Sequence, residues 1–332
     1  MQIDIVGGGL SGLSTAITLK NLHKTIEVNV FEKHEKVGYN PDGRRCGEAY
    51  TYDKEWKYWK PVGKSYYNDI YNFQIILSNK SYTLKRKPGT SYVLNRQEFL
   101  LQNCKKAKEL GVNFFTNQKI KSIDELDGDY IIDASGCPSI LKRDLKIKHQ
   151  ILGRSYQQSL ENSNCFVGDT VKIFVQNSTG YYWIFPRDSK KKEVNIGFGI
   201  LFGNTNLKLK ECLNRFKIEN DIKGEVNHVT GGVIPLGIQR PLKYNNILFV
   251  GDAGVGTFPL TAEGIYRALL SGEIAAQCIV KHQPQKYPYE IHRKFIKWDI
   301  VGKSIIRSGN ILSYIGPEAS NLLYRKFLDF IY

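Results

Sequence analysis

The chain opens with a strand, a glycine-rich turn and a helix, and this unit limits its fold more than any other feature. Residues 3–9 are mostly apolar and end in consecutive glycines, and residues 10–22 carry the apolar spacing of a helix. Residues 26–32 then alternate as a second strand that ends in the acid Glu32. Such a βαβ unit, with Gly7-x-Gly9-x-x-Gly12 at its first turn and an acid about 20 residues later, is the fingerprint of a dinucleotide-binding site.

The three glycines have separate roles in this fingerprint. Gly7 permits the tight turn, Gly9 lets the backbone approach a phosphate, and Gly12 lets the helix and the sheet pack closely. A pyrophosphate would then meet the positive end of the helix dipole. The carboxylate of Glu32 would accept hydrogen bonds from the ribose hydroxyls of an adenosine.

A second motif lies far downstream, where residues 246–254 read as a buried strand that runs directly into Gly251-Asp252. Two motifs in this order are what a flavoprotein needs to hold both ends of one FAD. The first cradles the pyrophosphate, and the second brings the Asp252 carboxylate to the ribityl chain beside the isoalloxazine ring. The sequence contains a single dinucleotide fingerprint, so we expect no dedicated NAD(P)H domain.

The periodicity of the remaining chain predicts an α/β fold, with a Rossmann-like FAD-binding domain, an inserted antiparallel β-sheet substrate domain and C-terminal helices. We expect strands at 71–77, 81–84, 112–115, 130–136 and 225–235, antiparallel strands within 165–201, and helices at 96–110, 206–222 and 261–281. The predicted FAD-binding domain is discontinuous and comprises 1–50, 90–150 and 241–285. The substrate domain comprises 51–89 and 151–240, and a C-terminal helical region comprises 286–332.

The composition is that of a globular protein with a basic surface. The 332 residues are 42% hydrophobic and 24% charged, with a net charge of +15 and a pI of about 9.3. A Lys-, Asn-, Ile- and Tyr-rich composition, as AT-rich genomes produce, accounts for this charge as readily as an anionic lipid surface or an acidic redox partner does. No nucleic-acid-binding module is recognisable, so we expect no nucleic-acid partner.

Cysteine spacing and hydropathy give expectations about the compartment. The six cysteines, at 46, 104, 137, 165, 212 and 278, form no CxxC pair, which argues against a metal site or a disulfide framework. The first strand begins at Gln2, and no apolar run reaches membrane-spanning length. We therefore expect a cytoplasmic protein without a signal peptide.

These motifs resemble the geranylgeranyl reductase family, within the large group of flavoproteins built like p-hydroxybenzoate hydroxylase. Three segments place the chain in the broad group. They are the glycine fingerprint with Glu32 and Lys33, the run Asp133-Ala134-Ser135-Gly136, and Gly251-Asp252 followed by Pro259 and Gly264-Ile265. Two more segments, Arg44-Arg45-Cys46-Gly47-Glu48 and Tyr181-x-Trp183-x-Phe185-Pro186, are similar to segments typical of prenyl-chain reductases.

The sequence departs from the family pattern in two respects. Ala262 stands where the resemblance predicts a glycine, before Glu263-Gly264. The chain is also shorter than many family members, mostly at its C-terminal end, which leaves open the length of a lipid tunnel and hence the size of the substrate.

The resemblance implies a set of FAD-binding residues. The set is Gly7, Gly9, Gly12, Leu13, Glu32, Lys33, Arg45, Cys46, Gly47, Ala49, Arg96, Ile120, Asp133, Gly136, Gly251, Asp252, Gly264 and Ile265. In it, Arg96 would reach the FAD phosphates or the ribityl chain. A helix expected to start near Thr261 would direct the N–H groups of Gly264 and Ile265 toward the flavin edge that becomes negative on reduction.

The implied substrate-binding residues are Tyr181, Trp183, Phe185, Pro186 and Pro259. Alternate residues on a strand share a face, so the three aromatic residues would point the same way. They would form either an apolar wall for a prenyl chain or an ordinary core strand.

Cys46 is the candidate catalytic residue. Arg44 and Arg45 precede it, and neighbouring cations lower the pKa of a thiol and raise its reactivity. Cys46 would either donate a proton to an alkene or shape the flavin pocket through its backbone.

The resemblance implies reduction of C=C double bonds in a geranylgeranyl or other prenyl lipid by hydride transfer from reduced FAD. Archaeal membrane-lipid precursors, geranylgeranyl diphosphate and menaquinone side chains all stay open as substrates. NAD(P)H or reduced ferredoxin would donate the electrons, and the positive surface favours an acidic ferredoxin. We expect a monomer.

A basic, aromatic tail would either lie on the inner face of the cell membrane or cap the substrate domain. The residues that suggest this are Trp298, Lys303, Arg307, Tyr314, Tyr324, Arg325 and Lys326.

Two other functions fit parts of the same pattern. A flavin-dependent monooxygenase or halogenase often carries Trp-x-Trp-x-Ile-Pro on the strand over the flavin, and the segment from Tyr181 to Pro186 lies in a similar place. That alternative does not explain the segment around Cys46. A non-catalytic flavin redox sensor or electron carrier would need no apolar cavity beside the ring.

Overall fold

The structure is a computed structural model that describes residues 1–38, 47–52, 59–77, 80–150, 152–176, 180–201 and 207–315. The chain forms two units. The first unit comprises Met1–Asn40, Gln97–Leu152 and Ile234–Ile300, and the second comprises Pro41–Arg96, Gly153–Val233 and Val301–Tyr332.

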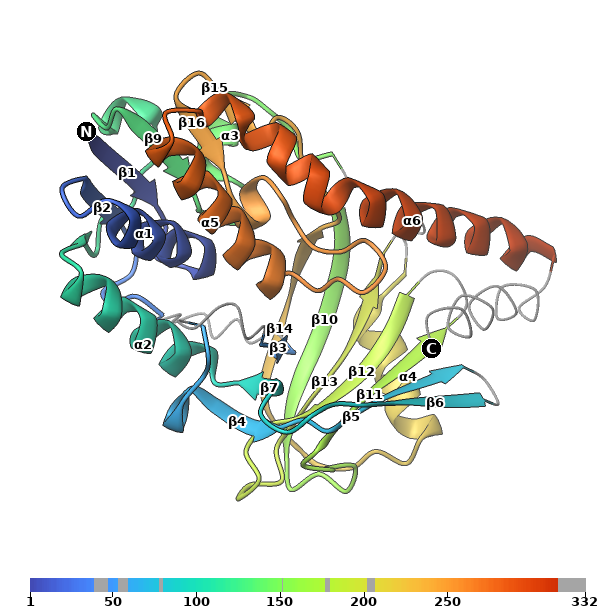
Figure 1. The fold of residues 1–332 in the computed structure, drawn as a ribbon. Helices are drawn as coiled ribbons and strands as arrows, with labels where there is room; N and C mark the ends of the chain where they lie inside the picture. Colours follow the sequence, from blue (N-terminus) through green and yellow to red (C-terminus); the bar gives the residue numbers. More distant parts are fainter. Residues whose placement is uncertain are drawn as a thin grey trace. The chain divides into compact units, whose positions relative to one another are not determined.

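The first unit contains a six-stranded sheet in the order β15-β16-β9-β1-β2-β8 (Figure 1). Its strands β1, β2, β8, β9, β15 and β16 are Gln2–Val6, Glu27–Phe31, Asn113–Phe115, Tyr130–Asp133, Lys243–Tyr244 and Ile247–Phe249. All neighbours pair in parallel except β15 with β16. The chain leaves β1 toward β2 on one side and meets β9 on the other, so β1 and β9 flank the switch point where α/β proteins bind ligands. The predicted Rossmann-like fold is confirmed.

Two helices of the first unit approach each other through their backbones. Helix α1 (Leu10–Leu22) follows β1, and helix α5 (Ile265–Val280) follows β16. The Ser14 hydroxyl donates a hydrogen bond to the Leu269 carbonyl at 2.6 Å, and a Cβ on Gly272 would lie 2.4 Å from the Ser11 carbonyl oxygen. Glycine at 272 therefore brings the N-terminal helix and the helix after the second motif into contact.

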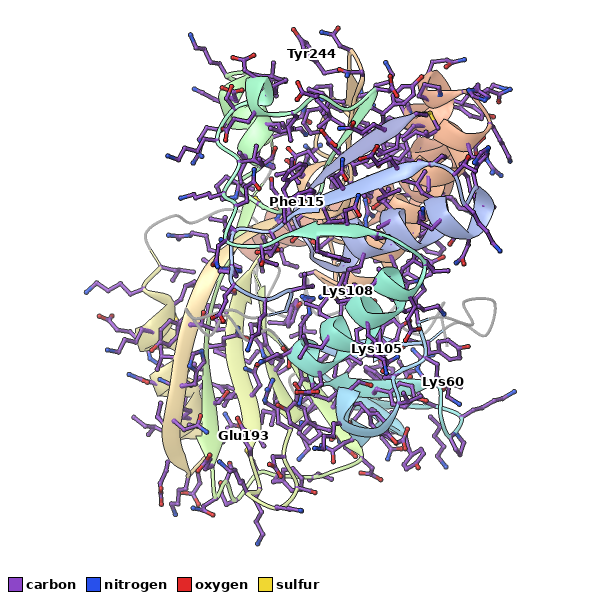
Figure 2. All side chains as sticks on the ribbon, turned by 90° about the vertical axis from the view of Figure 1, so that its left-hand side faces the viewer. Lys60, Lys105, Lys108, Phe115, Glu193 and Tyr244 are labelled. Carbon is purple, nitrogen blue, oxygen red and sulfur yellow. The ribbon has the colours of Figure 1, made fainter. Side chains whose placement is uncertain are left out.

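The first unit also contains α3 (Ile140–Asp144) and most of helix α2 (Arg96–Glu109). Lys105 and Lys108 project from the exposed face of α2 (Figure 2). Helix α6 (Tyr287–Ile315) begins in the first unit, after a short 3-10 turn at Pro284–Lys286.

The second unit contains a seven-stranded sheet in the order β14-β10-β13-β12-β11-β5-β6 and a three-stranded sheet in the order β3-β7-β4. The large sheet consists of β5 (Asn72–Leu77), β6 (Lys80–Lys85), β10 (Leu152–Glu161), β11 (Thr170–Gln176), β12 (Gly180–Pro186), β13 (Val194–Ile200) and β14 (Glu225–Pro235). The small sheet consists of β3 (Ala49–Thr51), β4 (Tyr66–Asp69) and β7 (Ser91–Leu94).

The two faces of the large sheet are covered differently. Helix α4 (Leu209–Glu219) covers one face, where Leu213 and Phe216 pack with Tyr182, Ile184 and the buried residues of β13. On the opposite face, Val93 of the small sheet packs with Val171 and Phe185. The odd-numbered residues of β12 therefore face the small sheet, and the even-numbered residues face the helix.

The second motif does not continue directly into a helix, so the prediction of a helix from residue 261 is wrong at its N-terminal end. Helix α5 begins at Ile265. The preceding residues form a closed turn, because Phe258 N–H donates to the Glu263 carbonyl at 3.0 Å and Ala262 N–H donates to the Phe258 carbonyl at 2.8 Å. Ala262 has a φ of +54°, in the left-handed region that glycine favours. This explains why the family pattern predicts glycine at that position.

The predicted tail is a single helix as far as it is described. Helix α6 contains Trp298, Lys303, Arg307 and Tyr314, whereas Tyr324, Arg325 and Lys326 lie outside the described residues. Among the described residues, no helix is both long enough and apolar enough to span a membrane.

Candidate functional site

The glycine turn after β1 is shaped to receive an anion. Gly7 has a φ of +104°, and a Cβ there would lie 2.6 Å from the Ala134 carbonyl oxygen. A Cβ on Gly12 would lie 2.0 Å from the Gly7 carbonyl oxygen. By contrast, no atom lies within 4 Å of a Cβ built on Gly9. Two glycines thus allow close packing, and the third leaves open space at the N-terminus of α1, where backbone N–H groups attract anions.

The acid at the end of β2 lies beside this turn. Glu32 is buried, and its Oε2 accepts a hydrogen bond from the Gly8 N–H at 2.9 Å. Its Oε1 accepts one from the His34 N–H at 3.0 Å. Lys33, next to it in sequence, is exposed. The Glu32 carboxylate is therefore fixed next to the phosphate cradle, as the fingerprint predicts.

The loop after β9 is organised by the Asp133 carboxylate, which is fully buried. Its Oδ1 accepts hydrogen bonds from the Ser135 N–H at 3.0 Å and the Ser135 hydroxyl at 2.6 Å, and its Oδ2 accepts one from the Ser139 hydroxyl. Gly136 in this loop has a φ of +89° and open space around a built Cβ. Any contribution of Asp133 to ligand binding therefore acts through the shape of the loop.

The Gly251-Asp252 motif meets the N-terminal fingerprint. Gly251 has a φ of +54°, and a Cβ there would lie 2.5 Å from the Ser11 hydroxyl oxygen of α1. Its N–H donates to the Ser271 hydroxyl of α5 at 2.9 Å. The two motifs at opposite ends of the sequence thus form one site in the first unit.

Asp252 lies near the start of α5. A Cβ built on Gly264, the N-cap of this helix, would be 3.7 Å from the Asp252 Oδ1. The N–H groups of Gly264 and Ile265 belong to the first turn and have no acceptor within the helix. Burial, together with the negative charge of Asp252, raises the pKa of the Cys137 thiol to about 12, so Cys137 is a neutral thiol at this site.

The aromatic residues of β12 form a row on one face of the large sheet in the second unit. The ring centroids of Tyr181 and Trp183 are 5.9 Å apart, and those of Trp183 and Phe185 are 6.4 Å apart. The prediction that these three side chains share a face is confirmed.

The neighbouring strand β13 leaves room for this row. Gly197 is paired with Trp183, and a Cβ on Gly197 would lie 2.1 Å from the indole ring. Gly199 is paired with Tyr181, and a Cβ there would lie 3.4 Å from the same ring. The indole N–H donates to the Asn195 side-chain oxygen at 2.7 Å. The indole ring therefore lies against the β13 backbone at glycines that carry no side chain. One buried hydrogen bond fixes its orientation.

The segment that contains Cys46 leads into the same region of the second unit. A Cβ on Gly47 would lie 2.0 Å from the Phe185 ring, so the Gly47 backbone lies directly against that ring. The two segments whose pairing suggests a prenyl reductase therefore touch each other. Arg44, Arg45 and Cys46 lie outside the described residues.

Comparison with known proteins agrees with this geometry. A family model for the geranylgeranyl reductase catalytic domain matches residues 153–233, and one for an NAD(P)-binding Rossmann-like domain matches residues 5–73. A digeranylgeranylglycerophospholipid reductase of Methanoculleus marisnigri is 24% identical over 312 residues, which are 84% of this chain and 76% of that protein. The chain is therefore similar to geranylgeranyl reductases over most of its length.

Other relatives match over shorter stretches. A digeranylgeranylglycerophospholipid reductase of Thermoplasma acidophilum is 38% identical over 154 residues, 45% of this chain. The matches to it and to the proteins of Thermoplasma volcanium and Methanosphaerula palustris span 38%, 26% and 39% of those proteins' own lengths. This chain therefore matches less than half of the length of each of these three relatives.

Solved structures share the fold of this chain. A geranylgeranyl bacteriochlorophyll reductase-like protein from Thermoplasma acidophilum superimposes with a TM-score of 0.79 at 22% identity and covers 92% of this chain and 87% of its own. A flavin-dependent brominase gives a TM-score of 0.74 at 16% identity, with 98% and 90% covered. At these identities the likeness shows the fold alone, which is a flavoprotein fold.

The structure separates the residues expected to bind the cofactor. The first unit holds Gly7, Gly9, Gly12, Leu13, Glu32, Lys33, Ile120, Asp133, Gly136, Gly251, Asp252, Gly264 and Ile265. Leu13 and Ile120 are core residues, since both are buried. The second unit holds Gly47, Ala49 and Arg96. Of the expected substrate residues, Pro259 lies in the first unit, in the closed turn before α5, and Pro186 ends β12 in the second unit.

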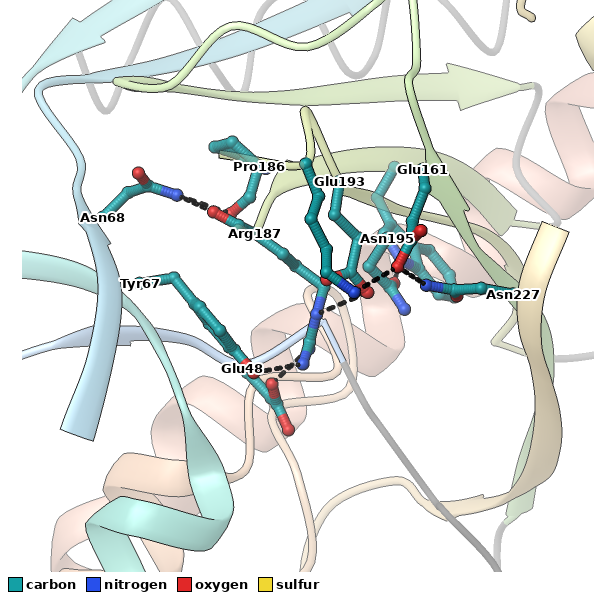
Figure 3. Close-up of polar contacts among 11 residues, drawn as sticks. Glu48, Tyr67, Asn68, Glu161, Pro186, Arg187, Glu193, Asn195 and Asn227 are labelled. Carbon is teal, nitrogen blue, oxygen red and sulfur yellow. Dashed lines mark hydrogen bonds and ion pairs between the residues drawn. The ribbon is translucent and has the colours of Figure 1, made fainter. Parts of the chain in front are cut away.

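A buried ionic network in the second unit was not predicted from the sequence. Arg187, directly after Pro186, pairs with the carboxylates of Glu48 and Glu193, and its Nη2 donates to the Tyr67 hydroxyl at 3.1 Å (Figure 3). Burial alone would lower the pKa of this guanidinium, but Glu48, Tyr67 and Glu193 outweigh burial and raise it. Because Glu48 adjoins Gly47 and has a φ of +61°, the network fixes the chain where the Cys46 segment enters β3. Arginine and glutamate this far apart in sequence give no local signal.

A second buried ion pair lies in the first unit. Arg267 of α5 donates to Asp299 of α6 at 2.6 Å and to the Val255 carbonyl at 2.8 Å. Its guanidinium lies between the rings of Phe258 and Phe295, at 4.9 and 4.5 Å from their centroids. The pair thus ties both helices to the segment that follows Gly251-Asp252 and precedes Pro259.

Proposed function

We propose that this protein is an FAD-dependent oxidoreductase that reduces C=C double bonds of a geranylgeranyl or related prenyl lipid. The observation that carries the proposal is the aromatic row of β12, which is fixed over the glycines of β13 and touches the backbone of Gly47. A row of aromatic side chains suits a hydrocarbon chain. The similarity of residues 153–233 to the geranylgeranyl reductase catalytic domain supports the same reaction class.

The first unit fits an FAD. Gly9 and Gly136 leave open space where a pyrophosphate needs close backbone approach, and Glu32 stands where a ribose needs an acceptor. In the second unit, Arg96 has a buried Nε without a hydrogen-bond partner within the described part of the chain, which suits an anionic ligand. Bound and reduced, FAD supplies the hydride for one alkene carbon.

The residues of the chain provide what else the reaction requires. The backbone N–H groups of Gly264 and Ile265 would stabilise negative charge at the helix N-terminus. Tyr181, Trp183 and Phe185 would orient the prenyl chain and exclude water. We assign to the Cys46 thiol the proton for the second alkene carbon; this residue lies outside the described part of the chain.

We propose that electrons come from reduced ferredoxin or NAD(P)H, and that the protein is a cytoplasmic monomer that contacts the inner face of the membrane. The net charge of +15 supports both an acidic donor and an anionic lipid surface. A prenyl phospholipid is the substrate class that such a contact would supply.

Anaerobic incubation of the dithionite-reduced protein with geranylgeranyl lipids, followed by mass spectrometry, tests the reaction. Each reduced bond should add two hydrogens to the lipid mass. Unchanged lipid in the presence of correctly bound flavin would refute the proposal. Substrate-stimulated NAD(P)H oxidation coupled to oxygen consumption would indicate a monooxygenase or halogenase instead.

Two matched glycine variants test the aromatic row. In Gly197→Ala the new methyl group must displace the Trp183 indole, because it would be 2.1 Å away, so alkene turnover should fall. In Gly199→Ala the 3.4 Å distance is an ordinary contact, so turnover should persist. Both variants should bind FAD as the wild type does. Equal turnover in the two variants would show that the position of the indole does not matter for the reaction.

The role of Cys46 has its own test. Cys46→Ser should slow alkene turnover and leave flavin binding unchanged, because serine is a much weaker acid than cysteine. Unchanged turnover would remove the thiol from the mechanism and leave only a structural contact.

A further inference from the structure

The Trp183 indole lies lengthwise along β13. Its benzene ring lies over Gly197, since a Cβ built on that residue would be 2.1 Å from the indole Cζ2. At the far end of the ring, the Cζ3 would be 3.4 Å from a Cβ on Gly199. At the other end, the Nε1 is 2.7 Å from the Asn195 Oδ1. The indole therefore spans three alternate residues of β13, which face it together because alternate residues of a strand share a face.

Asn195 distinguishes between the two orientations that this ring can adopt. Rotation about χ2 of a tryptophan is roughly two-fold, so either edge of the indole can be turned toward Asn195. Gly197 and Gly199 have no side chains that would favour one edge. The indole N–H is only a donor, so its partner must be the oxygen of the amide and not the nitrogen. In the other orientation the N–H would leave this acceptor, and the benzene ring would lie against the amide.

Both partners of this hydrogen bond are buried, since Asn195 is 1% exposed and Trp183 is 7% exposed. A buried donor that loses its acceptor is not compensated by water, and the loss corresponds to a factor of roughly 10 or more in an equilibrium constant. Glu193, two residues before Asn195 on the same face of β13, belongs to the ionic network of Arg187 (Figure 3). The amide thus stands between that network and the aromatic row.

We propose that Asn195 is a positioning residue of the prenyl-chain site. Its amide oxygen selects the indole orientation in which the N–H is satisfied within the protein, so that the ring presents only carbon atoms to the chain. A hydrocarbon in contact with an unpaired N–H would leave that group desolvated, and an indole with two orientations would hold the chain in more than one position. The inference rests on the proposed function and adds to it a residue that acts through Trp183.

NMR of the oxidised holoprotein with ¹⁵N-labelled indole nitrogens tests the orientation without any turnover. The chain has four tryptophans, and the Trp183 signal is the one that Trp183→Phe lacks. In Asn195→Leu and in the smaller Asn195→Ala, which both remove the acceptor, this signal should move upfield or split in two.

The matched control is Ser159→Ala. Ser159 is paired with Asn195 across β10 and β13 and is 1% exposed, but its hydroxyl has no hydrogen-bond partner within the described part of the chain. Removing this hydroxyl should therefore leave the Trp183 signal where the wild type has it.

Binding of geranylgeraniol to the oxidised holoprotein, followed by flavin absorbance, tests the consequence independently of reduction. The dissociation constant should rise about tenfold in Asn195→Leu. In Ser159→Ala it should stay within roughly twofold of the wild type, and Asn195→Leu should add no more than that when Trp183→Phe has already removed the N–H.

An unmoved Trp183 signal in both Asn195 variants, no binding of geranylgeraniol to the wild type, or the same loss of affinity with and without the indole N–H would overturn the proposal. If the wild type and the variants bind geranylgeraniol with the expected ratios but the wild type does not reduce prenyl lipids, the role of Asn195 is upheld and the proposed reaction is wrong.

Discussion

Replacing Arg187 with methionine should destabilise the second unit strongly. Arg187 is 3% exposed, and the two carboxylates that it pairs with, Glu48 and Glu193, are 4% and 5% exposed. Both buried carboxylates pair with the Arg187 guanidinium, which also lies 4.6 Å from the Tyr67 ring centroid. Breaking a buried ion pair by removing one partner costs about 3–5 kcal/mol, because the remaining charge is left uncompensated.

Urea unfolding followed by tryptophan fluorescence measures this loss. Glu48→Gln removes one of the two carboxylates, so Glu48→Gln/Arg187→Met should be more stable than the sum of the single losses predicts, by about 1–3 kcal/mol. The control is Lys191→Met. Lys191 also pairs with a glutamate, Glu161, at 2.7 Å, but it is 57% exposed, and its loss should be within experimental error.

The loss in Arg187→Met should also depend on pH. A buried carboxylate without its cation is relieved by taking up a proton, so the folded variant binds protons more readily than the unfolded chain. Its stability then rises as the pH falls, and the difference from the wild type should shrink between pH 8 and pH 5. A loss no larger than that of Lys191→Met, or the same loss at both pH values, would refute the assignment of a buried ionic network around Arg187.

Three further predictions concern other parts of the first unit. Gly9→Ala should weaken FAD binding without changing the urea midpoint of the apoprotein. Gly12→Ala, with its Cβ 2.0 Å from a carbonyl oxygen, should not fold. If the two variants have the same stability and the same affinity for FAD, the geometry described for the glycine turn is wrong. Ala262→Gly should raise the free energy of unfolding by up to about 1 kcal/mol, because it relieves a φ of +54°, and a lower stability in urea would mean that chain entropy outweighs this relief. Burial lowers the pKa of Lys142 to about 8, so the unfolded chain holds this proton to higher pH and stability should rise between pH 8 and 10, by up to about 1.4 kcal/mol per pH unit. In Lys142→Met the free energy of unfolding should not show this rise. If urea unfolding gives the same change in free energy between pH 8 and pH 9.5 for the variant as for the wild type, the prediction is wrong.

The sequence predicts the cofactor half of the fold well, because its signals are local. Glycines at fixed spacing after a strand, with Glu32 at the end of the next strand, specify the turn, the helix and the acid together. The strand before Gly251-Asp252 is predicted equally well from its apolar residues. The sequence predicts the start of α5 four residues too early. Residues 261–264 instead form a turn that is closed by backbone hydrogen bonds around Ala262.

The second unit was less predictable, because its contacts join residues far apart in sequence. The role of Gly197 follows from the register of β12 and β13, which pairs it with Trp183. Two glycines at alternate positions of a strand, opposite a strand of alternate aromatics, are a signal that would have suggested this pairing. No comparable signal exists for Arg187, whose partner Glu48 is separated from it by 139 positions.

Each of the two buried ion pairs holds an irregular segment beside residues of the candidate site. Arg267–Asp299 fixes the segment between Asp252 and Pro259, and Arg187–Glu48 fixes the segment between Cys46 and β3. Apolar residues of similar volume would be at least as stabilising as buried pairs of this kind, so stability alone does not explain them. Each pair instead holds an irregular segment that contains a residue with positive φ, Gly256 or Glu48, next to residues assigned to the cofactor or the substrate. We infer that the charges define a single position for backbone that neither a helix nor a strand constrains. Replacing either pair with well-packed apolar residues should therefore preserve folding and still reduce turnover.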